Sequence, residues 1–269
     1  MELTVMTYNI ASGRYYADDA AITPDGKIPV DLSRCAQVIR ELAPDICGIN
    51  EINHFLPGYP EKMGYGFSPE DQTGYLADAS GLEKSYFGKA IHMDGRGDYG
   101  NSVLSRYPIL EADVIPIPNP EFYDEDRYYE PRAIARVKLD VPGGLTVLQV
   151  HVGLAVTESQ NAVVTLCKIL DETTGPVILM GDFNMVPNNF LLDRIRQRLT
   201  EVVPQGEGYV HSFPSWPRDA QLPPAMRDYP RCKIDYIFVS HHFKATACHV
   251  HQTRASDHMP MIARLRLEA

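Results

Sequence analysis

Short apolar runs rich in β-prone residues recur along this 269-residue chain, and each of them ends at or beside a polar residue. In the clearest case, the run at residues 176–180 leads directly into Gly181-Asp182-Phe183-Asn184. Such runs are typical of buried strands. Because alternate residues of an extended chain point the same way, Asp182 and Asn184 are expected on one side. A carboxylate that holds a water beside an amide that donates to an oxyanion suits hydrolysis.

Five further segments repeat this arrangement. The runs at residues 3–8, 45–50, 145–150 and 236–239 are predicted as strands, and a polar triplet precedes the last apolar run. The polar residues at their edges are, in chain order, Asn9, Glu51, His151, Asp235 and Ser256-Asp257-His258. Each of them alone fits an ordinary turn or cap. Together they indicate that several strand ends build one site above a packed sheet.

In this ordered set, from Asn9 to His258, the chain resembles the endonuclease/exonuclease/phosphatase superfamily. That family includes pancreatic-type deoxyribonuclease, abasic-site endonucleases, neutral sphingomyelinases, inositol-polyphosphate phosphatases and poly(A) deadenylases. The segment Ile49-Asn50-Glu51 departs from the family pattern, because members often have a glutamine before the glutamate. The resemblance implies a four-layered α/β sandwich, two packed mixed β-sheets with helices on the outer faces, and a single catalytic domain over residues 1–269.

The chemistry of a phosphoester defines what the site must supply. Its transition state for in-line attack spreads negative charge over the phosphoryl oxygens, so the site needs a cation, fixed donors and an activated water. Glu51 is the best candidate ligand for Mg²⁺, with Mn²⁺ as the alternative, because both ions prefer hard oxygen ligands. Asn9 is expected to offer its amide oxygen to the ion or to its waters. Asp257 is expected to be a further ligand.

The remaining roles follow from the resemblance and from the chemistry of the side chains. By analogy with the family, Asp182 positions or deprotonates the attacking water, and Asn184 donates to a phosphoryl oxygen. His151 is expected to be a second donor that faces the phosphate. His258 is expected to bind or protonate a phosphate oxygen or to act as a base. Asp235 is expected to orient the ring of His258 and to raise its pKa.

Two residues outside the motifs are predicted to bind the substrate. Arg132 opens a β-prone run and is expected to clamp a phosphate with its planar guanidinium. Asn101 lies in another run and is expected to help set His151 or the substrate. For both residues, a structural role fits nearly as well as a role in binding the substrate.

The charge of the chain limits the kind of substrate. It has 25 Lys and Arg against 35 Asp and Glu, a formal net charge of −10, and no run of basic residues. We therefore expect no extended basic surface for nucleic acid. We favour a phosphoester that is small or that is bound through only one or two phosphates. Long loops at 119–131 and 213–230 carry Tyr123, Tyr128, Tyr129 and Trp216, which are expected to form a specificity rim.

Cysteine usage and hydropathy indicate the cell compartment. The five cysteines are odd in number and have no Cys-x-x-Cys spacing, so a disulfide framework or a structural zinc site is not expected. No window has the ~18–20 apolar residues of a membrane span. We expect a cytoplasmic protein without a transmembrane segment, and the sequence leaves its oligomeric state open.

Periodicity places the remaining elements. Helices are predicted at 31–43, at 157–172 with capping-box spacing over 157–160, and at 190–199. Further strands are predicted at 85–92, 101–105, 114–118, 133–139 and 261–267.

Several functions remain open from the sequence. The core motifs do not separate a nuclease acting on DNA or RNA from a lipid phosphodiesterase or a sugar-phosphate phosphatase, because fold and centre do not fix the substrate. A catalytically inactive binding module on the same fold is the alternative of another class. A Ser-His-Asp hydrolase is disfavoured, since the chain has no Gly-x-Ser-x-Gly motif.

Overall fold

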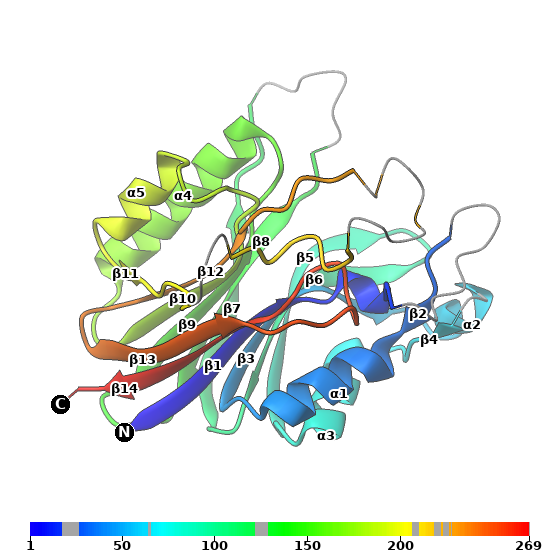
Figure 1. Ribbon diagram of the computed structural model, residues 1–269, viewed down its shortest axis with the longest axis horizontal. Helices are drawn as coiled ribbons and strands as arrows, with labels where there is room; N and C mark the ends of the chain where they lie inside the picture. The colour runs from blue at the N-terminus through cyan, green and yellow to red at the C-terminus, as the bar shows by residue number, and fades with distance from the viewer. Residues whose placement is uncertain are drawn as a thin grey trace.

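Two six-stranded β-sheets pack face to face, and helices lie on the outer face of each sheet, so the chain has four layers (Figure 1). This computed structural model describes residues 1–17, 27–63, 66–121, 129–205, 210–217, 222, 226 and 228–268. The four-layered sandwich that the resemblance implied is confirmed. Among the described residues, none of the helices combines the length and the apolarity that a membrane crossing requires.

The two sheets share one pattern of strand directions. The orders are β13-β14-β1-β3-β6-β5 and β11-β12-β10-β9-β8-β7. In each sheet one inner pair is parallel, β1 with β3 and β10 with β9, and the other pairs are antiparallel. The bounds are β1 (Glu2–Asn9), β3 (Ile46–Phe55), β5 (Lys84–Met93), β6 (Gly97–Ser105), β7 (Ile109–Ile117), β8 (Arg132–Leu139), β9 (Leu145–His151), β10 (Val177–Asp182), β11 (Thr200–Glu201), β12 (Asp235–Val239), β13 (Phe243–Val250) and β14 (Met261–Leu267).

Three apolar cores separate the four layers. Helices α1 (Leu32–Leu42) and α3 (Gln72–Ser80) pack on the outer face of the first sheet, and α4 (Val156–Glu172) and α5 (Leu191–Arg196) on that of the second. The third core lies between the sheets. Strand alternation explains the division, because Val5 and Val147 face the central core while Met6 and Leu148 face the helices.

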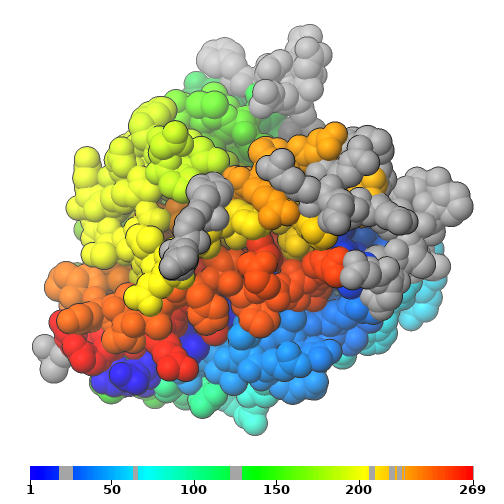
Figure 2. All heavy atoms as spheres, in the orientation of Figure 1, coloured from blue at the N-terminus to red at the C-terminus, as the bar shows by residue number. Residues whose placement is uncertain are grey.

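The segments between these elements hold smaller pieces of secondary structure. They contain the 3-10 turn η1 (Ala11–Gly13), helix α2 (Tyr59–Met63) and a two-stranded parallel ladder of β2 (Val30–Asp31) and β4 (Gly66–Phe67). On the face seen in Figure 2, the C-terminal segment, orange to red, crosses the middle between the yellow-green region of α4 and α5 and the blue α1. The C-terminal strand β14 thereby lies beside the N-terminal strand β1.

Most predicted elements are confirmed, although some begin or end several residues away from the predicted position, as β6 and β7 do. The predicted helix at 31–43 is α1, with Asp31 as its N-cap and Ala43 in the left-handed conformation after its last residue. The helix predicted at 157–172 begins one residue earlier, because Ala155 is its N-cap and Glu158 accepts the Ala155 N–H at 2.9 Å. Helix α3 was not predicted, although Asp71 and Gly81 cap it in the usual way. Strand β13 was not predicted either.

Strand direction explains why the polar residues gather at one end of the sandwich. The parallel pairs bring the carboxyl ends of β1, β3, β9 and β10 to the same end, where the antiparallel strands β8 and β12 begin. In the resulting register Asp182 lies beside His151 on one side and beside Asp235 on the other. The fold therefore assembles these residues from segments that are distant in sequence.

The buried side chain of Asn50 joins the two sheets near this end. Its Oδ1 accepts from the backbone N–H of Asp182 at 3.0 Å and from Nε2 of Gln149 at 2.9 Å. Its Nδ2 donates to the carbonyl of Val150 at 2.9 Å and to Oδ1 of Asn101 at 2.7 Å. Every donor and acceptor that the amide uses is buried, so each needs its partner.

We expect Asn50→Ala to lower the free energy of unfolding by about 2–4 kcal/mol, because it leaves several buried polar groups without partners. The measurement is urea unfolding followed by circular dichroism. Asn161→Ala is the matched control, since that side chain makes one hydrogen bond to Pro118 at the surface, and it should cost less than about 1 kcal/mol. Equal losses in the two variants would contradict the role given to Asn50.

Candidate active site

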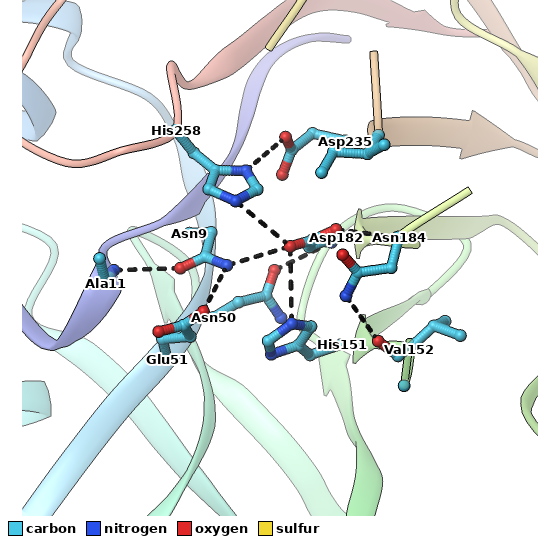
Figure 3. A network of polar contacts seen from close by, with 12 residues as sticks. Asn9, Ala11, Asn50, Glu51, His151, Val152, Asp182, Asn184, Asp235 and His258 are labelled. Carbon is cyan, nitrogen blue, oxygen red and sulfur yellow. Dashed lines mark hydrogen bonds and ion pairs between the residues drawn. The ribbon is translucent and has the colours of Figure 1, made fainter. Parts of the chain in front are cut away.

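Asp182 lies at the centre of the polar cluster (Figure 3). Its Oδ2 accepts from Nδ2 of Asn9 at 3.0 Å and lies 3.5 Å from Nε2 of both His151 and His258. Its Oδ1 accepts from the backbone N–H of Asn184 at 2.9 Å. Burial raises the pKa of Asp182 to about 7, while the charge of His258 acts in the opposite direction. The carboxylate is thus held by fixed donors and faces both imidazole rings.

His258 is bound to the carboxylate of Asp235. The distance from His258 Nδ1 to Asp235 Oδ2 is 2.8 Å, and both side chains are almost fully buried. Burial alone would lower the pKa of His258, but the charges of Asp235 and Asp182 outweigh it and hold that pKa well above its ordinary value. The ring of Phe213 lies 4.9 Å from the imidazole, between centroids. His258 is therefore a fixed, positively charged donor that faces Asp182.

His151 differs from His258 in its partner, which is an arginine and not a carboxylate. Nη1 of Arg132 lies 2.7 Å from Nδ1 of His151. An arginine can only donate, so Nδ1 accepts and the ring hydrogen lies on Nε2, which faces Asp182. Burial, followed by the charges of Arg132 and His258, lowers the pKa of His151 well below its ordinary value. Arg132 therefore fixes the tautomer of a neutral His151 that donates through Nε2.

Asn184 turns back toward the second sheet. Its φ of 50° is in the left-handed region, and its Nδ2 donates to the carbonyl of Val152 at 2.8 Å. The end of β10 needs a glycine at position 181, because Gly181 has a φ of 145° and a Cβ there would lie 1.9 Å from the carbonyl oxygen of Val150. Only one of the two hydrogens on Asn184 Nδ2 bonds to Val152, which leaves the other for a ligand.

Glu51 lies at a bulge in β3. Asn50 pairs with Asn101 and Ile52 with Gly100, so the ladder leaves Glu51 without a partner strand residue, and its φ is 57°. The bulge directs the carboxylate toward the cluster, where its Oε1 accepts from Asn9 at 3.0 Å. A non-glycine residue in this conformation carries backbone strain, which clusters at functional sites.

Asn9 and Arg14 complete the surroundings of Glu51. Oδ1 of Asn9 accepts from the backbone N–H of Ala11 at 3.0 Å, so its Nδ2 is the atom that faces Glu51 and Asp182. The oxygen that we expected to bind the ion thus has one lone pair in use. Nη2 of Arg14 lies 3.3 Å from Oε2 of Glu51.

Asp257 is placed by the loop that precedes β14. Oγ of Ser256 lies 2.8 Å from the carbonyl of Asn9, to which it donates, and 3.2 Å from Oδ1 of Asp257. Burial is the main cause that raises the pKa of Asp257, and the charge of Glu51 contributes to the rise. Two carboxylates that repel each other form a donor set suited to a cation, because the cation removes that repulsion.

A second group of possible ligands is Asp182, Asp235 and His258, whose nearest donor atoms lie within 4.8 Å of one another. These three residues already form the contacts described above, in which His258 uses both ring nitrogens. An imidazole must be unprotonated at the ligating nitrogen, and this one is held positively charged. A cation held by this group would therefore have to displace the contact between His258 and Asp235.

The two residues predicted to bind the substrate, Arg132 and Asn101, have different surroundings. Arg132 contacts His151 and lies 3.0 Å from Glu130. Asn101 is buried and bonds to Asn50 and to the carbonyl of Ala133, so it supports the site from within the sheet.

The predicted aromatic rim is only partly within the described residues. Tyr123 and Tyr128 lie outside them, and Tyr129 is buried. Trp216 is 2% exposed and packs with Tyr16, so the expectation of an exposed stacking residue at Trp216 is wrong.

Sequence reasoning missed three residues at the site. They are Asn50, which it noted only as a departure from the family pattern, Arg14 and Phe213. The sequence could have indicated Arg14, because it lies in the short segment that follows Asn9 at the end of the first strand. Phe213 had none, since its contact with His258 joins segments that are distant in sequence.

Comparisons with known proteins show which family and which fold this chain shares. An uncharacterised protein of Escherichia coli strain K12, YbhP, is 25% identical over 98% of this chain and 96% of its own length. A crystal structure of an endonuclease/exonuclease/phosphatase from Beutenbergia cavernae is 28% identical, with a TM-score of 0.72 over 100% of this chain and 72% of that one.

A mannosyl-6-phosphatase of Bacteroides thetaiotaomicron has the same fold, with a TM-score of 0.70 over 98% of this chain and 100% of its own at 16% identity. The sequence profile of the Endonuclease/Exonuclease/phosphatase family matches residues 6–258, which is nearly the whole chain. The chain therefore belongs to the endonuclease/exonuclease/phosphatase family.

Proposed function

We propose that this chain is a divalent-metal-dependent hydrolase of phosphoesters, with phosphodiesters as the first substrates to test, in which an activated water attacks in line. One observation carries the proposal. Asp235, His258, Asp182, Asn9 and Glu51 form a continuous row across both sheets, with successive contacts of 2.8, 3.5, 3.0 and 3.0 Å. The row joins a base, a charged donor and a candidate cation ligand, which are the parts that phosphoester hydrolysis requires.

Asp182 is proposed to position and deprotonate the attacking water. Its carboxylate is held by Asn9 and by the backbone of Asn184, so its orientation is fixed for this role. His258, oriented by Asp235, donates to a phosphate oxygen or to the leaving oxygen.

Two neutral donors complete the proposed oxyanion site. His151 donates through Nε2, because Arg132 holds the other ring nitrogen as an acceptor. The second hydrogen on Asn184 Nδ2 is available to a phosphoryl oxygen.

Glu51 and Asp257 are proposed to hold Mg²⁺ or Mn²⁺, with Asn9 beside them. When bound, the ion would supply Lewis-acid stabilisation of the negative charge that develops on the phosphoryl oxygens. Arg14 keeps the carboxylate of Glu51 in place from the other side. Few protein ligands suit Mg²⁺, which keeps several of its waters.

A phosphoester that is small, or that is bound through only one or two phosphates, is favoured over long duplex DNA. The net charge of −10 opposes broad contact with nucleic-acid phosphates. A panel of phosphate monoesters, phosphodiesters, RNA and plasmid DNA with Mg²⁺ or Mn²⁺ tests the proposal. Efficient plasmid cleavage that falls steeply with salt would favour a nuclease, and no cleavage of any ester would favour a binding module.

The proposal also takes residues 1–269 as one catalytic domain in a reducing, cytoplasmic location. The location is supported by the cysteines, all five of which are free and four of which are buried.

Removal of divalent metal should abolish hydrolysis of the preferred ester, and Mg²⁺ or Mn²⁺ should restore it. Glu51→Gln should weaken Mn²⁺ binding, measured by calorimetry, by at least about tenfold, because it removes a charged oxygen ligand. Glu83→Gln is the matched control, since that side chain is 81% exposed, and it should bind Mn²⁺ as the wild type does. Full activity after rigorous chelation would refute metal dependence.

Asp235→Asn and His258→Ala should each lower kcat by ~10²–10⁴, the range for lost acid–base or electrostatic assistance. The double variant should lose little more than either single variant, because the two side chains act as one unit. His92→Ala is the control, because His92 also contacts an aspartate, at 2.6 Å, but is half exposed. Additive losses in steady-state kinetics would contradict the pairing.

A further inference from the structure

A cavity of about 320 Å³ adjoins the proposed centre on the side of Glu51. We name it the arginine cavity, because its lining includes Arg14, Arg96 and Arg132 together with the carboxylates of Glu51 and Glu130. Three positive and two negative charges leave an excess of one positive charge, whereas the chain as a whole carries −10. The cavity is thus a locally positive region in an acidic protein.

Arg96 is the arginine of this cavity that forms no ion pair with an Asp or Glu of the described chain. Its Nη2 donates to Oδ1 of Asn53 at 3.1 Å, and its guanidinium lies 5.6 Å from the centroid of the Phe55 ring. Its Nε is buried without a hydrogen-bond partner. A guanidinium has five N–H donors, so most of the donors of Arg96 remain for a ligand.

The backbone fixes the position of Arg96 in the turn between β5 and β6. Its N–H donates to the carbonyl of Met93 at 3.0 Å, and its carbonyl accepts from the N–H of Leu56 at 2.9 Å. Gly97 has a φ of 121°, and a Cβ there would lie 2.3 Å from the carbonyl oxygen of His54. Glycine therefore allows this turn to dock closely on β3, which holds Arg96 in the cavity wall.

The other two arginines connect the cavity to the centre. Arg14 lies 3.3 Å from Glu51, and Arg132 lies 2.7 Å from His151. Glu51 belongs to the row around Asp182, and Nε2 of His151 lies 3.5 Å from Oδ2 of Asp182. A substrate held at the centre therefore has the arginine cavity beside it, on the side of Glu51.

We propose that the arginine cavity binds a second anionic group, a carboxylate or a phosphate, of a small substrate whose phosphoester lies at the centre. The inference rests on the proposed phosphoester hydrolysis and narrows its substrates to small molecules with two anionic groups. Guanidinium groups bind both anions through paired N–H donors. A volume of about 320 Å³ is at the lower end of the range for small-molecule sites, which suits one ring with its anionic group.

The test compares aryl phosphates that differ in one para substituent. They are para-carboxyphenyl phosphate, para-phenylene bisphosphate and the neutral para-carbamoylphenyl phosphate, each as the monoester and as the methyl diester, with Mg²⁺. At least one ester with an anionic para substituent should have a kcat/KM in the wild type that exceeds the value for the carbamoyl ester by at least about tenfold. The carboxyl and phosphate arms identify which anion the cavity takes.

Arg96→Gln should reduce this preference to within about twofold of unity, because it removes the charge and the paired donors. Arg106→Gln is the matched control, since Arg106 follows the far end of β6 and lies 3.4 Å from Asp45 at the surface, and it should keep the preference. A wild type without the preference, or an Arg96→Gln protein that retains it, would overturn the inference.

Binding without turnover separates this inference from the proposed function. Calorimetry with para-carboxybenzyl phosphonate and para-carbamoylbenzyl phosphonate should give the same tenfold preference and the same dependence on Arg96. If no ester is cleaved but this binding preference holds, the proposed function fails and the anionic subsite stands. Cleavage without any preference would overturn the subsite alone, and neither cleavage nor preference would overturn both.

Discussion

The side-chain amide of Asn50 joins the two sheets beside the site, and the polar residues there depend on this contact. Asn50 belongs to β3, and it binds Gln149, the carbonyl of Val150 and the N–H of Asp182 in the second sheet. Because these groups are buried, a shift of one sheet against the other would leave several of them unpaired. The contact therefore sets the separation of Glu51 in the first sheet from Asp182 in the second.

The two histidines that face Asp182 show how a partner decides the charge of a side chain. His151 and His258 are both buried, and each places Nε2 at 3.5 Å from the same carboxylate oxygen. Burial, and after it the charge of Arg132, lowers the pKa of the first ring, whereas the charge of Asp235 outweighs burial and raises that of the second. One site thus holds a neutral donor and a charged donor at equal distance from its central carboxylate.

The strand ends were predictable, and the contacts between distant segments were not. Asp182 and His258 follow or precede apolar β-prone runs, and their order along the chain carries the family resemblance. Asn50 and Arg96 act through contacts that only the docking of the two sheets and a tight turn create, so no local pattern marks them. Trp216 lies in a proline-rich segment that reads as a surface loop, yet tertiary packing buries its ring.

The bulge in β3 has a consequence for how the chain tolerates change. Glu51 is the extra residue of that strand, so the hydrogen-bonded ladder on either side of it would be continuous without it. The sheet therefore places no demand on the identity of this residue beyond its left-handed backbone, which glycine adopts with less strain. Selection for stability alone would favour glycine here, so a glutamate at this position accords with the role proposed for its carboxylate.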